Sequence, residues 1–169
     1  MKQHKFSLNG FARDSIGRYT TARPVTADEL VELADQILSS KVMHSQPLSD
    51  PVTVKHWLIM RLAGRPHEVF CLLHLDNRHR VIAFEELFRG TIDGASVYPR
   101  EVVKQALKHN SAALIFVHNH PSGVPEPSDA DRRLTQRLKD ALALLDIRTL
   151  DHFIVGGAEI VSFAERGWL

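Results

Sequence analysis

The feature that most restricts the fold of this chain is an uninterrupted apolar run over residues 112–117. Its length suits a strand, and the lack of alternating polar residues is typical of a strand that is buried on both faces. A strand of this kind lies inside a sheet that helices cover on both sides. The run therefore predicts a layered α/β fold with a central strand at this position.

The remaining segments supply partners for this strand. Residues 69–75 and 80–88 have the composition of strands, and the turn residues between them indicate an antiparallel pair. Two further short strands are expected near residues 152–155 and 159–163. Apolar residues at helical spacing predict four helices, which begin near residues 27, 51, 99 and 129. We therefore expect an α/β fold in which a mixed β-sheet is flanked by helices.

The N-terminal part differs from the rest of the chain. Residues 1–24 are polar and show no period, so we expect an extended or poorly ordered arm there. Thr26, with Glu29 three residues later, is a capping-box pattern that starts a helix ending near residue 39. Turn-forming residues follow at 46–51. These features predict an N-terminal arm and helix over residues 1–45 and a main domain over residues 46–169.

Composition narrows the class of protein. The net charge of +1 provides no basic field, so it does not support nucleic acid as a partner. Cys71, the single cysteine, lies in an apolar segment, where we expect a small buried hydrophobe and a reducing, cytoplasmic setting. No apolar run approaches the roughly 20 residues of a membrane span, and no signal peptide is evident. We expect a globular cytoplasmic protein without membrane contact, and the sequence leaves the oligomeric state open.

A metal-binding pattern follows the central strand. His118 and His120 are two residues apart at the end of an extended segment, so both imidazoles point to one side. Asp131 then lies in the first turn of the next predicted helix. Three protein ligands with one position left for water are typical of catalytic zinc. A bound metal ion lowers the pKa of that water from about 16 to near 7.

Several residues of this region have alternative interpretations. Ser128 and Asp131 form a second capping-box pattern, a role that is compatible with metal binding because it fixes the carboxylate. Asn119 and Ser122 either bind substrate or hold the loop. The other histidines are expected at the surface, in turns or, for the last one, as a hydrogen-bonded structural residue: His74, His79, His109 and His152.

The pattern His-x-His-x7-Ser-x2-Asp, at residues 118, 120, 128 and 131, resembles the JAMM signature of MPN-type metallopeptidases. More narrowly, His118-Asn-His-Pro-Ser-Gly resembles the RadC family over about residues 47–169. Further matches are Gly90-Thr91, Tyr98-Pro99-Arg100-Glu101, Asn110-Ser111-Ala112-Ala113 and Leu150-Asp151-His152. Larger members carry an N-terminal helix-hairpin-helix module, and without its Gly-rich hairpin this chain is expected to be a short form. The resemblance implies an MPN/JAMM-like, cytidine-deaminase-like architecture.

The resemblance also implies roles for individual residues. Zn²⁺ would be held by His118, His120 and Asp131, and Ser128 would donate a hydrogen bond to the oxyanion or to the bound water. An upstream glutamate would act as general acid and base. Glu68, at the head of the strand 69–75, fits that order best. Glu85 on the partner strand is the competitor, and we expect the hairpin to place the two roughly opposite each other.

The implied function is a zinc-dependent hydrolase, a JAMM-type metallopeptidase that cleaves an amide or isopeptide bond in a peptide or protein substrate. The alternative is a DNA-associated accessory factor of repair or mobile elements, of the RadC type, without peptidase activity. A deaminase is disfavoured, because its His-x-Glu and Pro-Cys-x-x-Cys signature is absent and one cysteine cannot supply it. A binding module that has lost its metal is disfavoured by the intact ligand set.

Overall fold

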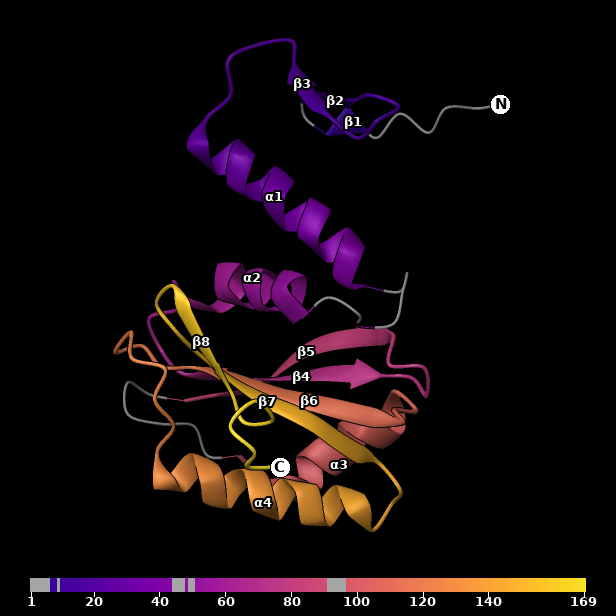
Figure 1. Cartoon of the computed structure of the whole chain (residues 1–169), viewed down its shortest axis with the longest axis vertical. Coiled ribbons are helices and arrows are strands. Elements are labelled where there is room, and N and C mark those ends of the chain that lie inside the picture. Colours follow the sequence, from indigo (N-terminus) through magenta and orange to yellow (C-terminus); the bar gives the residue numbers. More distant parts are fainter. Residues whose placement is uncertain (1–6, 9, 44–47, 49–50, 91–96) are drawn as a thin grey trace.

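The computed structural model describes residues 7–8, 10–43, 48, 51–90 and 97–169. Its elements, labelled in Figure 1, follow in the order β1 (Ser7–Leu8), β2 (Phe11–Arg13), β3 (Tyr19–Thr21), α1 (Ala27–Val42), α2 (Pro51–Leu62), β4 (Val69–Leu75), β5 (Val81–Arg89), α3 (Pro99–Lys108), β6 (Ala113–Asn119), α4 (Asp129–Ala143), β7 (Arg148–Gly156) and β8 (Glu159–Ser162). None of the described helices has the length and apolar content needed to traverse a bilayer.

A five-stranded sheet forms the centre of the molecule, in the strand order β5-β4-β6-β7-β8. The pair β6–β7 is parallel and the other three pairs are antiparallel. Helix α2 lies on one face of this sheet, and α3 and α4 lie on the other (Figure 1). The predicted mixed sheet flanked by helices is therefore confirmed, and the apolar run forms its middle strand.

The side chains of β6 alternate between two apolar cores, one on each face of the sheet. Ile115 and Val117 belong to the core under α2, which includes Trp57. Leu114 and Phe116 belong to the core under α3 and α4. Because side chains two residues apart point the same way, the residue that follows Phe116 on this second face is histidine 118. The core thus directs this imidazole toward α4.

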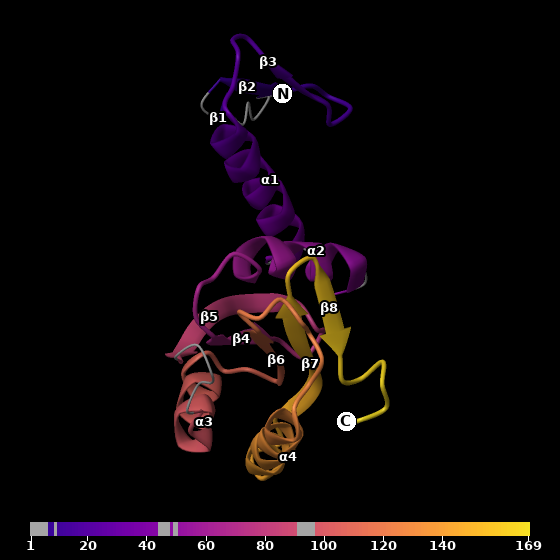
Figure 2. The same cartoon turned by 90° about the vertical axis from the view of Figure 1, so that its left-hand side faces the viewer.

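Within the described part of residues 1–24, three short strands form a second, smaller sheet that the sequence did not predict. Strands β1, β2 and β3 pair antiparallel in that order. Gly10 and Gly17 have φ angles of 96° and 88°, which let the chain reverse between these short strands. The polar composition of these residues gives no strand pattern, because the strands are held together mainly by backbone hydrogen bonds. Figures 1 and 2 show this sheet beyond the N-terminal end of α1, away from the main sheet.

The predicted helix starts agree with the structure. Thr26 and Ser128 are N-caps, and both capping boxes are complete. Helix α1 extends to Val42, beyond its expected end, and β7 begins at Arg148, before its expected start. Cys71 is fully buried, as expected, and burial raises the pKa of its thiol to about 12. The predicted break at 46–51 lies mostly outside the described residues.

Candidate metal centre

Two neighbouring elements bring the three predicted ligands together. His118 is the penultimate residue of β6 and His120 follows its end, while Asp131 lies in the first turn of α4. The Nε2 atom of His118 lies 3.1 Å from Nε2 of His120 and 3.3 Å from Oδ1 of Asp131. The Nε2 atom of His120 lies 3.7 Å from Oδ2 of Asp131. The three side chains therefore present one donor atom each to a common point.

The loop between β6 and α4 is held against the end of β7. The backbone N–H of His120 donates to the carbonyl of Val155, 2.8 Å away. The Nδ1 atom of His120 lies 2.8 Å from the carbonyl oxygen of Val124. Since a carbonyl only accepts, Nδ1 carries the proton of a neutral His120, and its Nε2 is left with a lone pair. The loop thus fixes both the position and the tautomer of this histidine.

A chain of hydrogen bonds fixes the tautomer of His118 in the same way. The hydroxyl of Thr135 donates to the backbone carbonyl of Asp131, 2.6 Å away, and so accepts from Nδ1–H of His152, also at 2.6 Å. The Nε2 atom of His152 is then bare and accepts from Nδ1–H of His118, 2.8 Å away. Nε2 of His118 is consequently left with a lone pair that faces the other two ligands.

This donor set fits a divalent cation. With both Nδ1 protons directed outward, two imidazole lone pairs and a carboxylate converge with no proton between them. Ligand atoms at about 2.0–2.1 Å from a tetrahedral zinc ion lie about 3.3 Å apart, close to the 3.1, 3.3 and 3.7 Å observed here. The Nδ1 atoms of both histidines also have hydrogen-bond partners that orient the rings, the carbonyl of Val124 for His120 and Nε2 of His152 for His118.

The candidate ligands shift one another's pKa values. A hydrogen bond to the carboxylate of Asp131 raises the pKa of His120 against the opposing effect of burial. Burial alone would raise the pKa of Asp131, but the imidazoles of His118 and His120 outweigh it and hold that pKa well below its usual value. Burial lowers the pKa of His152 well below its usual value, so this residue stays neutral and acts as a hydrogen-bond relay.

Ser128 positions the carboxylate. Its hydroxyl donates to Oδ2 of Asp131, 2.6 Å away, and its backbone N–H donates to the same oxygen at 2.7 Å. Because Oδ2 is held by the helix cap, Oδ1 is turned toward His118. The hydrogen bonds that cap α4 therefore also set the orientation of the Asp131 carboxylate.

Asn119 holds the segment that carries Glu68. Its side-chain oxygen accepts from the backbone N–H of Val69 at 2.8 Å, and its side-chain nitrogen donates to the carbonyl of His67 at 3.1 Å. These two bonds bracket Glu68, which is half-buried and whose negative charge contributes to the raised pKa of His120. Asn119 therefore supports the loop before β4, and Glu68 lies near the metal ligands.

Glu85 lies elsewhere, so the expectation that it sits opposite Glu68 was wrong. The tight turn pairs Leu75 with Val81, and this register places Glu85 beside Leu72. Glu68 is instead opposite Gly90, whose N–H donates to its carbonyl at 2.8 Å. Glu68 lies farther from the turn along its strand than Glu85 does along the partner strand, so the two residues cannot be opposite each other. Glu85 lies beside a different pair of histidines.

A family model described as a RadC-like JAB domain matches residues 48–168 of this chain. The chain belongs to the RadC family. The chain is 62% identical over 139 residues to a UPF0758 protein of Nitrosococcus oceani, a match that spans 82% of this chain and 62% of that protein. It is 55% identical over 152 residues to a UPF0758 protein of Vibrio cholerae, and this match spans 90% of the chain and 96% of that protein. The chain thus covers less than two thirds of the first relative and nearly all of the second.

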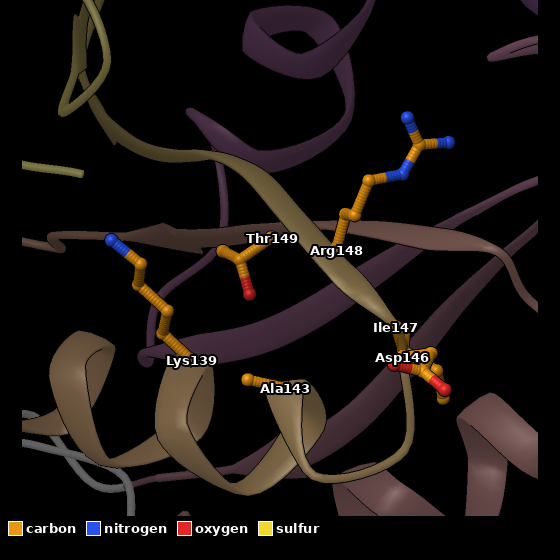
Figure 3. A pocket seen from close by; sticks show the side chains of 6 residues that line it. All are labelled: Lys139, Ala143, Asp146, Ile147, Arg148 and Thr149. Carbon is orange, nitrogen blue, oxygen red and sulfur yellow. The ribbon is translucent and has the colours of Figure 1, made fainter.

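A surface cavity of about 380 Å³ lies between α4 and the start of β7, at the end of the five-stranded sheet away from the candidate metal centre. Figure 3 shows Lys139 and Ala143 of α4 facing Thr149 of β7, while Arg148 turns away from the helix. None of the three metal-ligand candidates lines it. The cavity is therefore separate from the candidate metal centre.

Thr135 belongs to the candidate metal centre but was not predicted from the sequence. It lies four residues after Asp131 and therefore on the same side of α4, which was the available signal. His152 was interpreted as a hydrogen-bonded structural residue, and the structure shows that its hydrogen bonds lead to His118. Both residues act through a ligand rather than as ligands.

Replacing Thr135 with Val removes the hydroxyl at nearly constant volume. Nδ1 of His152 then loses its hydrogen-bond partner, so nothing fixes which of its ring nitrogens carries the proton. We expect zinc affinity to fall by about 10- to 100-fold, the usual cost of losing an outer-shell partner, in a competition titration with a chromophoric chelator. Thr149→Val is the matched control, because the buried hydroxyl of Thr149 has no hydrogen-bond partner. Equal affinities in the two variants would contradict the relay.

Proposed function

We propose that this protein is a zinc-dependent hydrolase that cleaves an amide or isopeptide bond in a peptide or protein substrate. The observation that carries the proposal is the convergence of two bare imidazole nitrogens and one carboxylate of His118, His120 and Asp131. Three protein ligands leave a fourth position for water or substrate, which is the arrangement of catalytic rather than structural zinc. Membership of a JAB-domain family supports a hydrolase of this kind.

When bound, zinc supplies a Lewis acid that acidifies a coordinated water and polarises a carbonyl. The residues of the chain supply the proton transfers and the orientation. Glu68, which lies near the ligands, accepts a proton from the attacking water and returns it to the leaving amine. The hydroxyl of Ser128 donates to the developing oxyanion after it releases Asp131, whose Oδ2 is still held by the backbone N–H of Ser128.

Cleavage by metal-free and zinc-reloaded protein tests the proposal. Tag-free protein is stripped with a chelator, reloaded with Zn²⁺ and incubated with a panel of peptides and isopeptide-linked conjugates. Cleavage is expected only after reloading, and Asp131→Asn, which removes the anionic ligand but can keep the helix cap, is expected to abolish it. Cleavage that is equal in the stripped and reloaded forms would overturn the proposal. So would a folded protein that takes up no zinc at this centre.

A DNA-binding measurement at increasing salt, combined with the same substrate panel, distinguishes the DNA-associated factor from the hydrolase. A nucleic-acid partner would bind through phosphates, and that binding would weaken steeply as salt is raised. The net charge of +1 does not favour this outcome. Salt-dependent binding of DNA by a zinc-loaded protein that cleaves no member of the panel would support the accessory factor instead of the hydrolase.

A further inference from the structure

A second group of metal-binding side chains lies on the same face of the sheet as the first. His74 is on β4, Glu85 is on β5, and His109 is the C-cap of α3. The Oε2 atom of Glu85 lies 3.6 Å from Nε2 of His74 and 3.4 Å from Nε2 of His109. One donor atom from each residue lies within 4.8 Å of the other two. Sequence reasoning placed His74 and His109 at the surface or in turns, and for His74 this was wrong.

Burial leaves two of these donor atoms without partners. His74 is 0% exposed, and neither its Nε2 atom nor Oε2 of Glu85 has a hydrogen-bond partner in the structure. Both atoms are shielded from solvent, so bulk water does not satisfy them. A buried polar atom without a partner is costly, and native proteins rarely leave two of them facing each other. A single group that interacts with both atoms at once would remove this cost.

We propose that His74, Glu85 and His109 form a second binding site for a divalent cation of the zinc class. A cation between the three donors satisfies both unpartnered atoms and the second histidine together. The observed spacings of 3.4 and 3.6 Å are close to the roughly 3.3 Å between ligands of a tetrahedral zinc ion. Imidazole and carboxylate donors suit zinc and neighbouring transition metals better than they suit calcium or magnesium.

The surroundings of His74 match those of a metal ligand. Its Nδ1 atom lies 2.8 Å from the hydroxyl of Ser111, which can hold the Nδ1 proton and leave Nε2 as the donor.

The two sites are too far apart to share a substrate atom. His118 pairs with Phe70 and Leu114 pairs with His74, so the clusters are four residues apart along the strands, about 13 Å at 3.3 Å per residue. Paired catalytic metal ions lie about 3.5–4 Å apart. The side chains of Leu72 and Phe116 fill the core between them. The second cation therefore ties the end of α3 to β4 and β5 and does not depend on the proposed hydrolase.

Zinc binding by a protein without the first site tests this inference. The tag-free double variant His120→Ala/Asp131→Asn is expected to retain one zinc ion per chain in equilibrium dialysis with elemental analysis. Zinc at a hundredfold excess over Kd is expected to raise its Tm by roughly 5–10 °C. Adding His109→Ala or, separately, Glu85→Gln to this background should abolish both the zinc ion and the rise in Tm. Adding His56→Ala, an exposed histidine of α2, should change neither.

Two results would overturn the inference. One is a folded double variant that binds no zinc, which would leave a simple ion pair between His109 and Glu85. The other is zinc retained after both His109→Ala and Glu85→Gln, which would place the ion elsewhere. Circular dichroism of the zinc-free variants verifies that each is folded. Because all of these proteins lack the first site and activity is not measured, failure here is distinct from failure of the hydrolase proposal.

Discussion

Replacing Glu68 with Gln should lower kcat by about 10²- to 10⁴-fold, the usual contribution of a general acid and base, while zinc binding at the first centre stays intact. The glutamine keeps the size of the side chain but cannot accept the proton of the attacking water. Glu68 precedes β4, its charge acts on His120, and Asn119 holds the backbone on both sides of it. Single-turnover cleavage and a zinc titration on the same preparation measure the two properties separately.

Glu86→Gln is the matched control for this prediction. Glu86 is an exposed carboxylate on β5 that pairs with Arg65, so its neutralisation should change kcat little. A loss of zinc together with activity in Glu68→Gln would mean that Glu68 is a ligand or a structural residue. Unchanged kcat would remove Glu68 from the mechanism and return the role of base to another group.

Replacing Gly156 with Ala should lower zinc affinity at the first centre by about 10-fold or more and destabilise the protein by about 1–3 kcal/mol. A Cβ atom at this position would lie 2.6 Å from the carbonyl carbon of Val124, and closer still to the backbone nitrogen of Pro125. Both are backbone atoms of the loop, so the loop itself must move. Because the carbonyl of Val124 holds Nδ1 of His120, that movement displaces a ligand.

Gly64→Ala is the control for this substitution. A Cβ atom at Gly64 meets no atom within 4 Å, so added volume is tolerated there and affinity should be unchanged. Zinc titration and thermal unfolding of the two variants, each with and without zinc, give the comparison. Gly156→Ala with native zinc affinity would show that the loop yields without moving His120.

The convergence of His118, His120 and Asp131 could be predicted from the sequence because the positions of these residues follow local rules. The two-residue period of a strand places His118 and His120 on one side, and the capping box fixes Asp131 in the first turn of a helix. Fold class followed from the central apolar run for the same reason. Each of these inferences needs only neighbours within a few residues.

Features that depend on pairing between distant segments could not be read in this way. The partner of Glu85 is set by the register of the β4–β5 hairpin, and the burial of His74 is set by α3, which packs on that face. His152 meets His118 only because β6 and β7 lie side by side, 34 residues apart in the chain. The small N-terminal sheet was missed because backbone hydrogen bonds leave no apolar pattern.

The hydrogen-bond relay begins on the backbone of Asp131 and ends on a histidine that faces the carboxylate of the same residue. It runs from the backbone carbonyl of Asp131 through Thr135 and His152 to His118, whose Nε2 atom lies 3.3 Å from the carboxylate of Asp131. This arrangement forms only when α4 has docked on both parallel strands, because its members come from α4, β6 and β7. In a partly folded chain the three candidate ligands would not be held together. If the proposed zinc site is correct, tight uptake of zinc is therefore expected to report that this half of the protein has reached its native arrangement.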